Sequence, residues 1–152
     1  AATNPEAHLI LVGTGPDFDK ISQLVLSSAY CNRIILYGET LEPQKMYAAM
    51  DAFVFPSRHE GLRVVLLDAQ ISGLRCIVSD RVTQEVDFGD ICWKSIEEEP
   101  EAWARAVLTE LEKPVSRYGC FDVHKDQMEE YDIAKSVKHL EQIYLDAYEN
   151  HK

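Results

Sequence analysis

Residues 51–80, DAFVFPSRHEGLRVVLLDAQISGLRCIVSD, contain the pattern that decides the fold. Two short apolar runs, residues 52–55 and 75–79, have the length and composition of buried strands. Between them, residues 63–72 have helical spacing, and Gly73 follows as a glycine does at the end of a helix. A strand, a helix and a second strand in this order predict parallel pairing in a sheet that helices cover.

The same alternation extends to both ends of the chain. Further strands are expected at residues 8–12, 34–37 and 90–93, and further helices at 17–29, 44–50, 100–111 and 132–148. In the last two helices, Trp103 and Tyr144 are interpreted as core anchors at helical spacing. The sequence therefore predicts an α/β fold, a Rossmann-like parallel sheet flanked by helices, in one domain over residues 1–152.

Composition excludes several classes of partner. The 152 residues carry a formal net charge of −11, which argues against nucleic acid and against adhesion of this domain to an anionic membrane. The four cysteines, Cys31, Cys76, Cys92 and Cys120, have no zinc-site spacing and suit a reducing cytosol. No apolar stretch has the length of a membrane span and no signal peptide opens the chain, which also lacks an initial Met and is interpreted as an excised fragment.

The loop and helix start within residues 51–80 offer the groups that a nucleotide sugar needs. A helix start presents unpaired N–H groups that attract phosphate, and Gly61 has no side chain to keep a ligand away. The carboxylate of Glu60 could accept hydrogen bonds from sugar hydroxyls. Asp68 lies one turn beyond Val64, on a face that could line the same cleft. These residues predict a nucleotide-sugar site at the carboxyl end of a strand.

Here the sequence resembles the family 4 glycosyltransferases with the GT-B fold, in the branch that builds capsular polysaccharide and exopolysaccharide. Glu-Gly-Leu, an acid eight positions after Glu60, Ala-Gln-x-x-Gly-Leu-x-Cys and Ser-Asp are similar to the E-x7-E segment of that family. Similar segments occur in the same order at residues 11–16, 34–38, 46–51 and 83–86, with a late one at 131–133. The resemblance covers residues 5–148 and implies the C-terminal, donor-binding half of a GT-B enzyme.

The resemblance also implies roles for individual residues. Glu60 would be the catalytic residue and contact the donor sugar, and Asp68 would hold the ribose hydroxyls where the family has its second Glu. The residues assigned to donor binding are Gly61, Leu62, Arg63, Val64, Asp68, Gly38 and Tyr37, with the last two near the base. No metal and no other cofactor is implied, because protein groups balance the charge of the leaving diphosphate.

The chain departs from the family pattern in ways that bear on activity. Asp68 is one methylene shorter than the expected Glu, and Arg63 and Arg75 stand where this branch usually has Pro. The family's first strand, its phosphate-clamping Arg and Lys, and the N-terminal acceptor domain are expected before residue 1. The fragment alone is therefore expected not to catalyse transfer. The parent enzyme is expected in the cytoplasm, with peripheral contact at the inner membrane face through the absent domain.

Two hypotheses remain open at this stage. The first is the donor-binding part of a retaining enzyme that uses a nucleotide-diphosphate sugar, a UDP-sugar, to extend a polysaccharide or glycolipid precursor. The second is a non-catalytic Rossmann-like module that binds a nucleotide or a protein. Structural interpretations are preferred for Gly13 and Gly15 as a tight turn and for His59 as an exposed loop residue. A flavodoxin-like or NAD-binding domain is less well supported, because Phe18 stands where the third glycine of the dinucleotide fingerprint would be.

Overall fold

The computed structural model describes residues 4–59, 64–89, 91–114, 125–129 and 131–150 of the chain. The chain divides into two compact units, Ala1–Pro43 and Gln44–Lys152. The predicted residues Glu60, Gly61, Leu62 and Arg63 lie outside the described residues, as do residues 115–124 of the stretch 114–126, for which the sequence pattern assigns no element.

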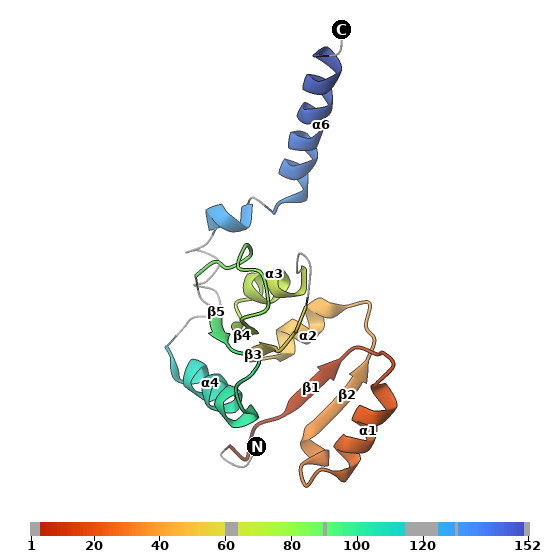
Figure 1. Ribbon diagram of the computed structural model, residues 1–152, viewed down its shortest axis with the longest axis vertical. Helices are drawn as coiled ribbons and strands as arrows, with labels where there is room; N and C mark the ends of the chain where they lie inside the picture. Colours follow the sequence, from red (N-terminus) through yellow and green to blue (C-terminus); the bar gives the residue numbers. More distant parts are fainter. Residues whose placement is uncertain (1–3, 60–63, 90, 115–124, 130, 151–152) are drawn as a thin grey trace. The chain divides into compact units, whose positions relative to one another are not determined.

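The first unit is a strand–helix–strand arrangement (Figure 1). Strand β1 (Leu9–Val12) and strand β2 (Ile34–Gly38) pair in parallel, and helix α1 (Phe18–Ser27) connects them through a short 3-10 turn at Cys31–Arg33. Both strands consist of apolar residues up to a glycine, which is why the pattern predicts them correctly. Helix α1 ends two residues earlier than predicted, because Ser28 is extended.

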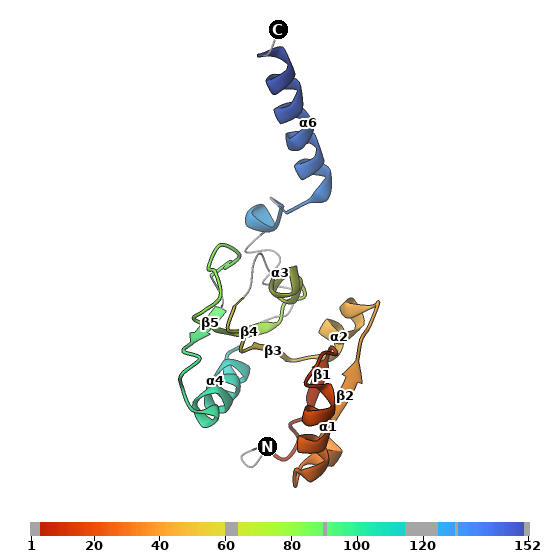
Figure 2. The ribbon, with the colours of Figure 1, turned by 45° about the vertical axis from the view of Figure 1, so that its right-hand side comes forward.

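The second unit contains a three-stranded parallel sheet with the order β3-β4-β5 (Figures 1 and 2). Its elements in chain order are α2 (Pro43–Ala49), β3 (Ala52–Phe55), α3 (Val64–Ile71), β4 (Arg75–Ser79), β5 (Ile91–Lys94), α4 (Pro100–Glu112) and α6 (Ile133–Glu149). Helices α3 and α4 lie on opposite faces of this sheet. The α/β class and the parallel pairing predicted from the sequence are thus confirmed, with the described strands distributed over two sheets.

The core of the second unit forms around its central strand. In β4, Cys76, Ile77 and Val78 are at most 1% exposed, as expected for an apolar run flanked by a strand on each side. Helix α3 covers one face of this strand with Leu66 and Ala69, both fully buried. Burial of Cys76 was predicted from its place in the run, and it behaves as a small hydrophobic residue.

Helix α3 ends where the sequence predicts, and the backbone shows why. Gly73 has a φ of +68°, a conformation that L side chains rarely adopt. The amide of Gly73 donates to the carbonyl oxygen of Gln70 over 2.9 Å, and that of Leu74 donates to the carbonyl oxygen of Ala69 over 3.0 Å. These two bonds form a Schellman motif, which satisfies the last carbonyls of the helix and turns the chain into β4.

One predicted core anchor is wrong. Trp103 on α4 is buried, with 9% of its surface exposed, but Tyr144 on α6 is 69% exposed. No residue of α6 is buried, and Val137 and Leu140 of the same stripe are also exposed. Helical periodicity predicts that a stripe exists, but it carries no information on which surface covers it.

Candidate functional site

The candidate site lies at the carboxyl edge of the β3-β4-β5 sheet. Because the three strands are parallel, the segments that follow Phe55, Ser79 and Lys94 all begin at this edge. Open α/β sheets bind ligands beyond the carboxyl ends of their strands. Residues 56–59 follow β3 at this edge, and α3 is the next described element along the chain.

Helix α3 has two distinct faces. Leu66, Ala69 and Gln70 are turned into the protein and are at most 3% exposed. On the other side, Val64 is 60% exposed, and Asp68, one turn later, is partly exposed. The structure therefore brings these two predicted residues onto one uncovered face, where a carboxylate can accept hydrogen bonds from a ligand.

The carboxylate of Asp68 has an aromatic neighbour on α2. Burial raises the pKa of the Tyr47 phenol above its ordinary value, and the negative charge of Asp68 raises it further, as does Cys76 to a smaller extent. Tyr47 is only 6% exposed and its ring packs edge-on against Phe53 at 6.1 Å between centroids. The phenol is thus part of the core on which α3 rests, and Asp68 lies at its border.

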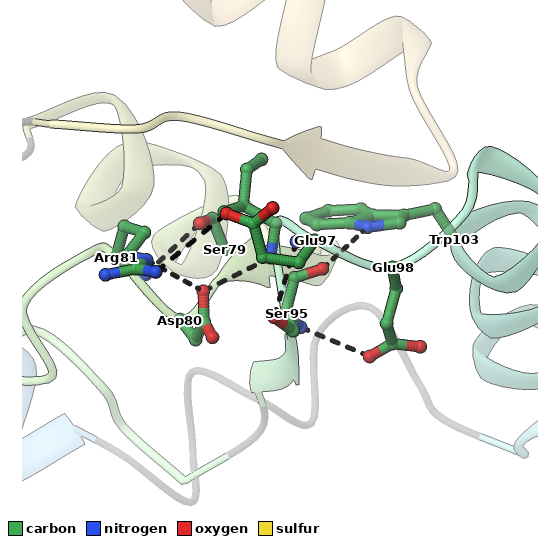
Figure 3. A network of polar contacts seen from close by, with 8 residues as sticks. Ser79, Asp80, Arg81, Ser95, Glu97, Glu98 and Trp103 are labelled. Atoms are coloured by element: carbon green, nitrogen blue, oxygen red, sulfur yellow. Dashed lines mark hydrogen bonds and ion pairs between the residues drawn. The ribbon is translucent and has the colours of Figure 1, made fainter.

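The segment after β4 supplies an arginine that the sequence interpretation missed. Arg81 forms ion pairs at 3.9 Å with Asp80 and with Glu97, and its side chain is 56% exposed (Figure 3). Ion pairs this exposed contribute little to stability, so the guanidinium can exchange these partners for a ligand. The sequence signal that could have identified Arg81 is its position, two residues after the buried strand that ends at Ser79.

Polar contacts fix the backbone on which Arg81 stands. The amide of Asp80 donates to the carbonyl oxygen of Lys94 over 2.8 Å, and Oδ1 of Asp80 accepts from the amide of Ile96 over 3.2 Å. Nε1 of Trp103 donates to the carbonyl oxygen of Ser95 over 3.1 Å (Figure 3). The segments that follow β4 and β5 are thereby joined to each other and to α4.

Arg75 lies at the other end of the sheet. It begins β4, and its guanidinium donates through Nη2 to the carbonyl oxygen of Lys113, the residue that caps the carboxyl end of α4. A cation at a helix carboxyl end complements the partial negative charge there. This contact links the start of β4 to the carboxyl end of α4.

Tyr37 and Gly38 belong to the first unit and close strand β2 there. Gly38 has a φ of +80°, and no heavy atom beyond its two chain neighbours lies within 4 Å of the position that a Cβ would take. Its carbonyl oxygen accepts from the amide of Gly13 over 2.8 Å, so this amide continues the strand pairing. Tyr37 is 49% exposed, and its ring is open to a ligand within that unit.

Other groups in the described part of the chain bear less on a site. His59 is exposed, and its carbonyl oxygen accepts from the hydroxyl of Ser57 over 3.4 Å. Among the described residues, no cluster of three or more His, Cys, Asp or Glu side chains could hold a metal ion. Within the same residues, no helix combines the length and the apolar character needed to cross a bilayer.

Comparison with known proteins identifies the family of this chain. The family model described as "Glycosyl transferases group 1" matches residues 1–113. The "Putative glycosyltransferase EpsF" of Bacillus subtilis (strain 168) is 35% identical over 102 residues, which are 66% of this chain and 27% of that protein. The "UDP-Gal:alpha-D-GlcNAc-diphosphoundecaprenol alpha-1,3-galactosyltransferase" of Escherichia coli is 31% identical over 77 residues, 50% of this chain and 20% of that protein.

A solved structure supports the fold. The crystal structure of TarM has a TM-score of 0.70 to this chain at 16% identity, covering 95% of this chain and 29% of that one. At this identity the likeness shows the fold alone, the α/β arrangement of a GT-B glycosyltransferase. The chain thus spans roughly a quarter of the length of the proteins that it matches. Since the family model covers most of its residues, the chain belongs to the group 1 glycosyltransferases.

Proposed function

We propose that this chain is the donor-binding part of a retaining glycosyltransferase that transfers a sugar from a UDP-sugar to a polysaccharide or glycolipid precursor. The observation that carries the proposal is the uncovered face of α3, where Val64 and Asp68 lie side by side. This helix starts at the carboxyl edge of a parallel sheet, which is where α/β proteins bind nucleotides.

Each proposed role follows from the chemistry of its group. The carboxylate of Asp68 accepts hydrogen bonds from the ribose hydroxyls, and the start of α3 directs partial positive charge to the diphosphate. Glu60 contacts the donor sugar as the catalytic residue, with the amides of Gly61, Leu62 and Arg63 near the phosphates. The resemblance alone assigns Tyr37 and Gly38, which belong to the first unit, to contacts with the base. Protein groups and not a metal balance the charge of the leaving diphosphate.

The relatives support the choice of donor and acceptor. The Escherichia coli relative carries a UDP-linked galactose and a diphosphoundecaprenol-linked acceptor in its name. A UDP-sugar and a lipid-linked precursor are therefore our proposal for this protein too. The matched segments make up 27% and 20% of the two relatives, which supports our proposal that residues 1–152 alone do not catalyse transfer. A lipid-linked acceptor would place the working enzyme at the cytoplasmic face of a membrane, with contact through another domain.

Calorimetric titration of UDP and UDP-sugars into the full-length protein tests the proposal. Saturable binding should be weakened about tenfold or more by Asp68→Ala and by Glu60→Ala, because each removes a carboxylate that accepts from the ligand. Glu112→Ala, which removes an exposed carboxylate at the end of α4, is the matched control and should bind as the parent does. Absence of binding to the unsubstituted protein would favour the non-catalytic module.

A further inference from the structure

A buried glutamine on α3 has no role in the function proposed so far. Gln70 is 3% exposed, two residues after Asp68, on the face of α3 that is turned into the protein. Amide side chains are seldom buried this completely, and those that are must satisfy their hydrogen bonds within the protein. The partners of Gln70 therefore indicate why a polar residue occupies this position.

The side chain of Gln70 holds the segment that follows β4. Its Nε2 donates to the carbonyl oxygen of Val86 over 2.7 Å, and its Oε1 accepts from the amide of Phe88 over 3.1 Å. In a parallel sheet, a residue of one strand bonds to a carbonyl and an amide that lie two residues apart on its neighbour. The side-chain amide of Gln70 bonds to the carbonyl of Val86 and the amide of Phe88 in the same way. A third bond, from Nε2 to the carbonyl oxygen of Leu66 over 3.2 Å, anchors the amide to its own helix.

These bonds matter because the held segment is itself buried. Val82, Val86 and Phe88 are at most 5% exposed, and the ring of Phe88 packs edge-on against Tyr131 at 6.1 Å. Without Gln70, the carbonyl of Val86 and the amide of Phe88 would each lose a hydrogen bond in a place with little access to water. A buried unpaired backbone group is costly, so the segment would shift to find other partners.

The segment begins at the proposed donor site. It follows β4, whose carboxyl end lies at the same sheet edge as that of β3, and it carries Arg81 at its start. Helix α3 begins at this edge and carries Asp68. The side-chain amide of Gln70 thus links two parts of the chain by hydrogen bonds. One is α3, which carries Asp68, and the other is the segment of residues 81–88, which begins with Arg81.

We propose that Gln70 is a positioning residue of the donor site. Its hydrogen bonds fix residues 81–88 relative to α3, so that Asp68 and Arg81 contact the same donor molecule. The proposal rests on the donor-binding function proposed above. It adds Arg81 as a cation for the diphosphate and Gln70 as the residue that orients it.

The first test compares UDP binding by two variants of the full-length protein, with the thermal unfolding of each measured in parallel. Gln70→Met keeps the length of the side chain and removes its hydrogen bonds. Leu74→Val removes one methylene of a residue that is 6% exposed at the amino end of β4, away from the candidate site. Gln70→Met should weaken UDP binding about tenfold, whereas Leu74→Val should leave it unchanged.

The second test replaces Gln70 by Glu, which has the same shape but whose ability to donate a hydrogen bond depends on pH. In Gln70→Glu, the protonated acid can donate to the carbonyl of Val86 and accept from the amide of Phe88, but the carboxylate cannot donate. Burial raises the pKa of such a carboxyl, so UDP affinity should be close to the parent at low pH and fall as the pH rises through that pKa. The parent and Leu74→Val, measured at the same pH values, should not show this added dependence.

The outcomes separate the two proposals. If the unsubstituted protein binds no UDP, the proposed function fails and the role of Gln70 fails with it. If the parent binds but Gln70→Met binds equally well, or if Leu74→Val weakens binding to the same extent, only the positioning role is overturned. A Gln70→Glu variant whose affinity follows the parent at every pH would overturn it as well.

Discussion

The indole Nε1 of Trp93 on β5 donates a hydrogen bond to Oδ2 of Asp87 over 2.8 Å. The other carboxylate oxygen of Asp87 accepts from the amide of Gly89 over 2.7 Å. The carboxylate of Asp87 thus links the segment between β4 and β5 to β5 itself, which is an edge strand of the three-stranded sheet.

We expect Asp87→Ala to lower the free energy of unfolding by about 1–2 kcal/mol, because hydrogen bonds to a charged group are lost and the Trp93 indole N–H loses its acceptor. Urea unfolding followed by circular dichroism measures this. Glu112→Ala, also the loss of one carboxylate, should change the stability by less than about 0.5 kcal/mol. Equal stability of the two variants would show that the contact with Trp93 contributes nothing.

Gly73 tests the end of helix α3. Its φ of +68° should make Gly73→Ala destabilising by about 1 kcal/mol, because a Cβ is strained in this conformation. Gly73→Asn should cost less, since Asn adopts this conformation more readily. Thermal unfolding of the two variants gives the comparison, and an alanine variant as stable as the parent would contradict the backbone geometry.

The pair of Glu98 and Lys94 makes a prediction for pH. The hydrogen bond from Lys94 lowers the pKa of Glu98 below its ordinary value, although some burial opposes this and the amide of Ser95 adds to the lowering. The favourable contact is therefore present above the ordinary pKa of 4.5 and is lost as the pH falls through the lower folded value.

Carbon-13 NMR of the Glu98 carboxyl should show this low titration midpoint. In Lys94→Met the midpoint should rise toward 4.5, because the largest cause of the lowering is gone. High salt should have a smaller effect than the substitution, since a direct hydrogen bond is screened less than a distant charge. An unchanged midpoint in Lys94→Met would rule out the pair as its cause.

The resemblance leads to the expectation of Glu at residue 68, where this chain has Asp, and substitutions at this position test whether the shorter side chain still binds the donor. If Asp68 reaches the ribose hydroxyls, Asp68→Glu should keep UDP affinity within about tenfold of the parent, because the carboxylate is retained on the same face of α3. Asp68→Asn should bind more weakly than Asp68→Glu, since hydrogen bonds to a charged acceptor are the stronger ones. Titration calorimetry on the full-length protein compares the two, and an Asp68→Asn variant that binds UDP as tightly as the parent would contradict a role for the charged carboxylate.

Much of the local structure could be predicted from the order of residues along the chain. The strand Ala52–Phe55 and the strand Arg75–Ser79 have the predicted bounds, because short apolar runs bounded by Pro56 and Gly73 leave little choice of period or length. The Schellman end of α3 was predictable from Gly73 for the same local reason. The shared face of Val64 and Asp68 also follows from helical spacing alone.

Only the tertiary structure decided which of these local elements meet. The role of Gln70 depends on Val86 and Phe88, which are 16 and 18 residues away and have no local signal that marks them as its partners. The hydrogen bond from Arg75 to the carbonyl oxygen of Lys113 joins residues that are far apart in the sequence. Arg81 lies at the carboxyl edge of the sheet because β3 and β4 pair in parallel. Tyr144 shows the opposite case. Its position in an apolar stripe can be recognised in the sequence, but no described residue buries its side chain. Periodicity is a property of neighbours along the chain, whereas contact between distant segments depends on how whole elements pack.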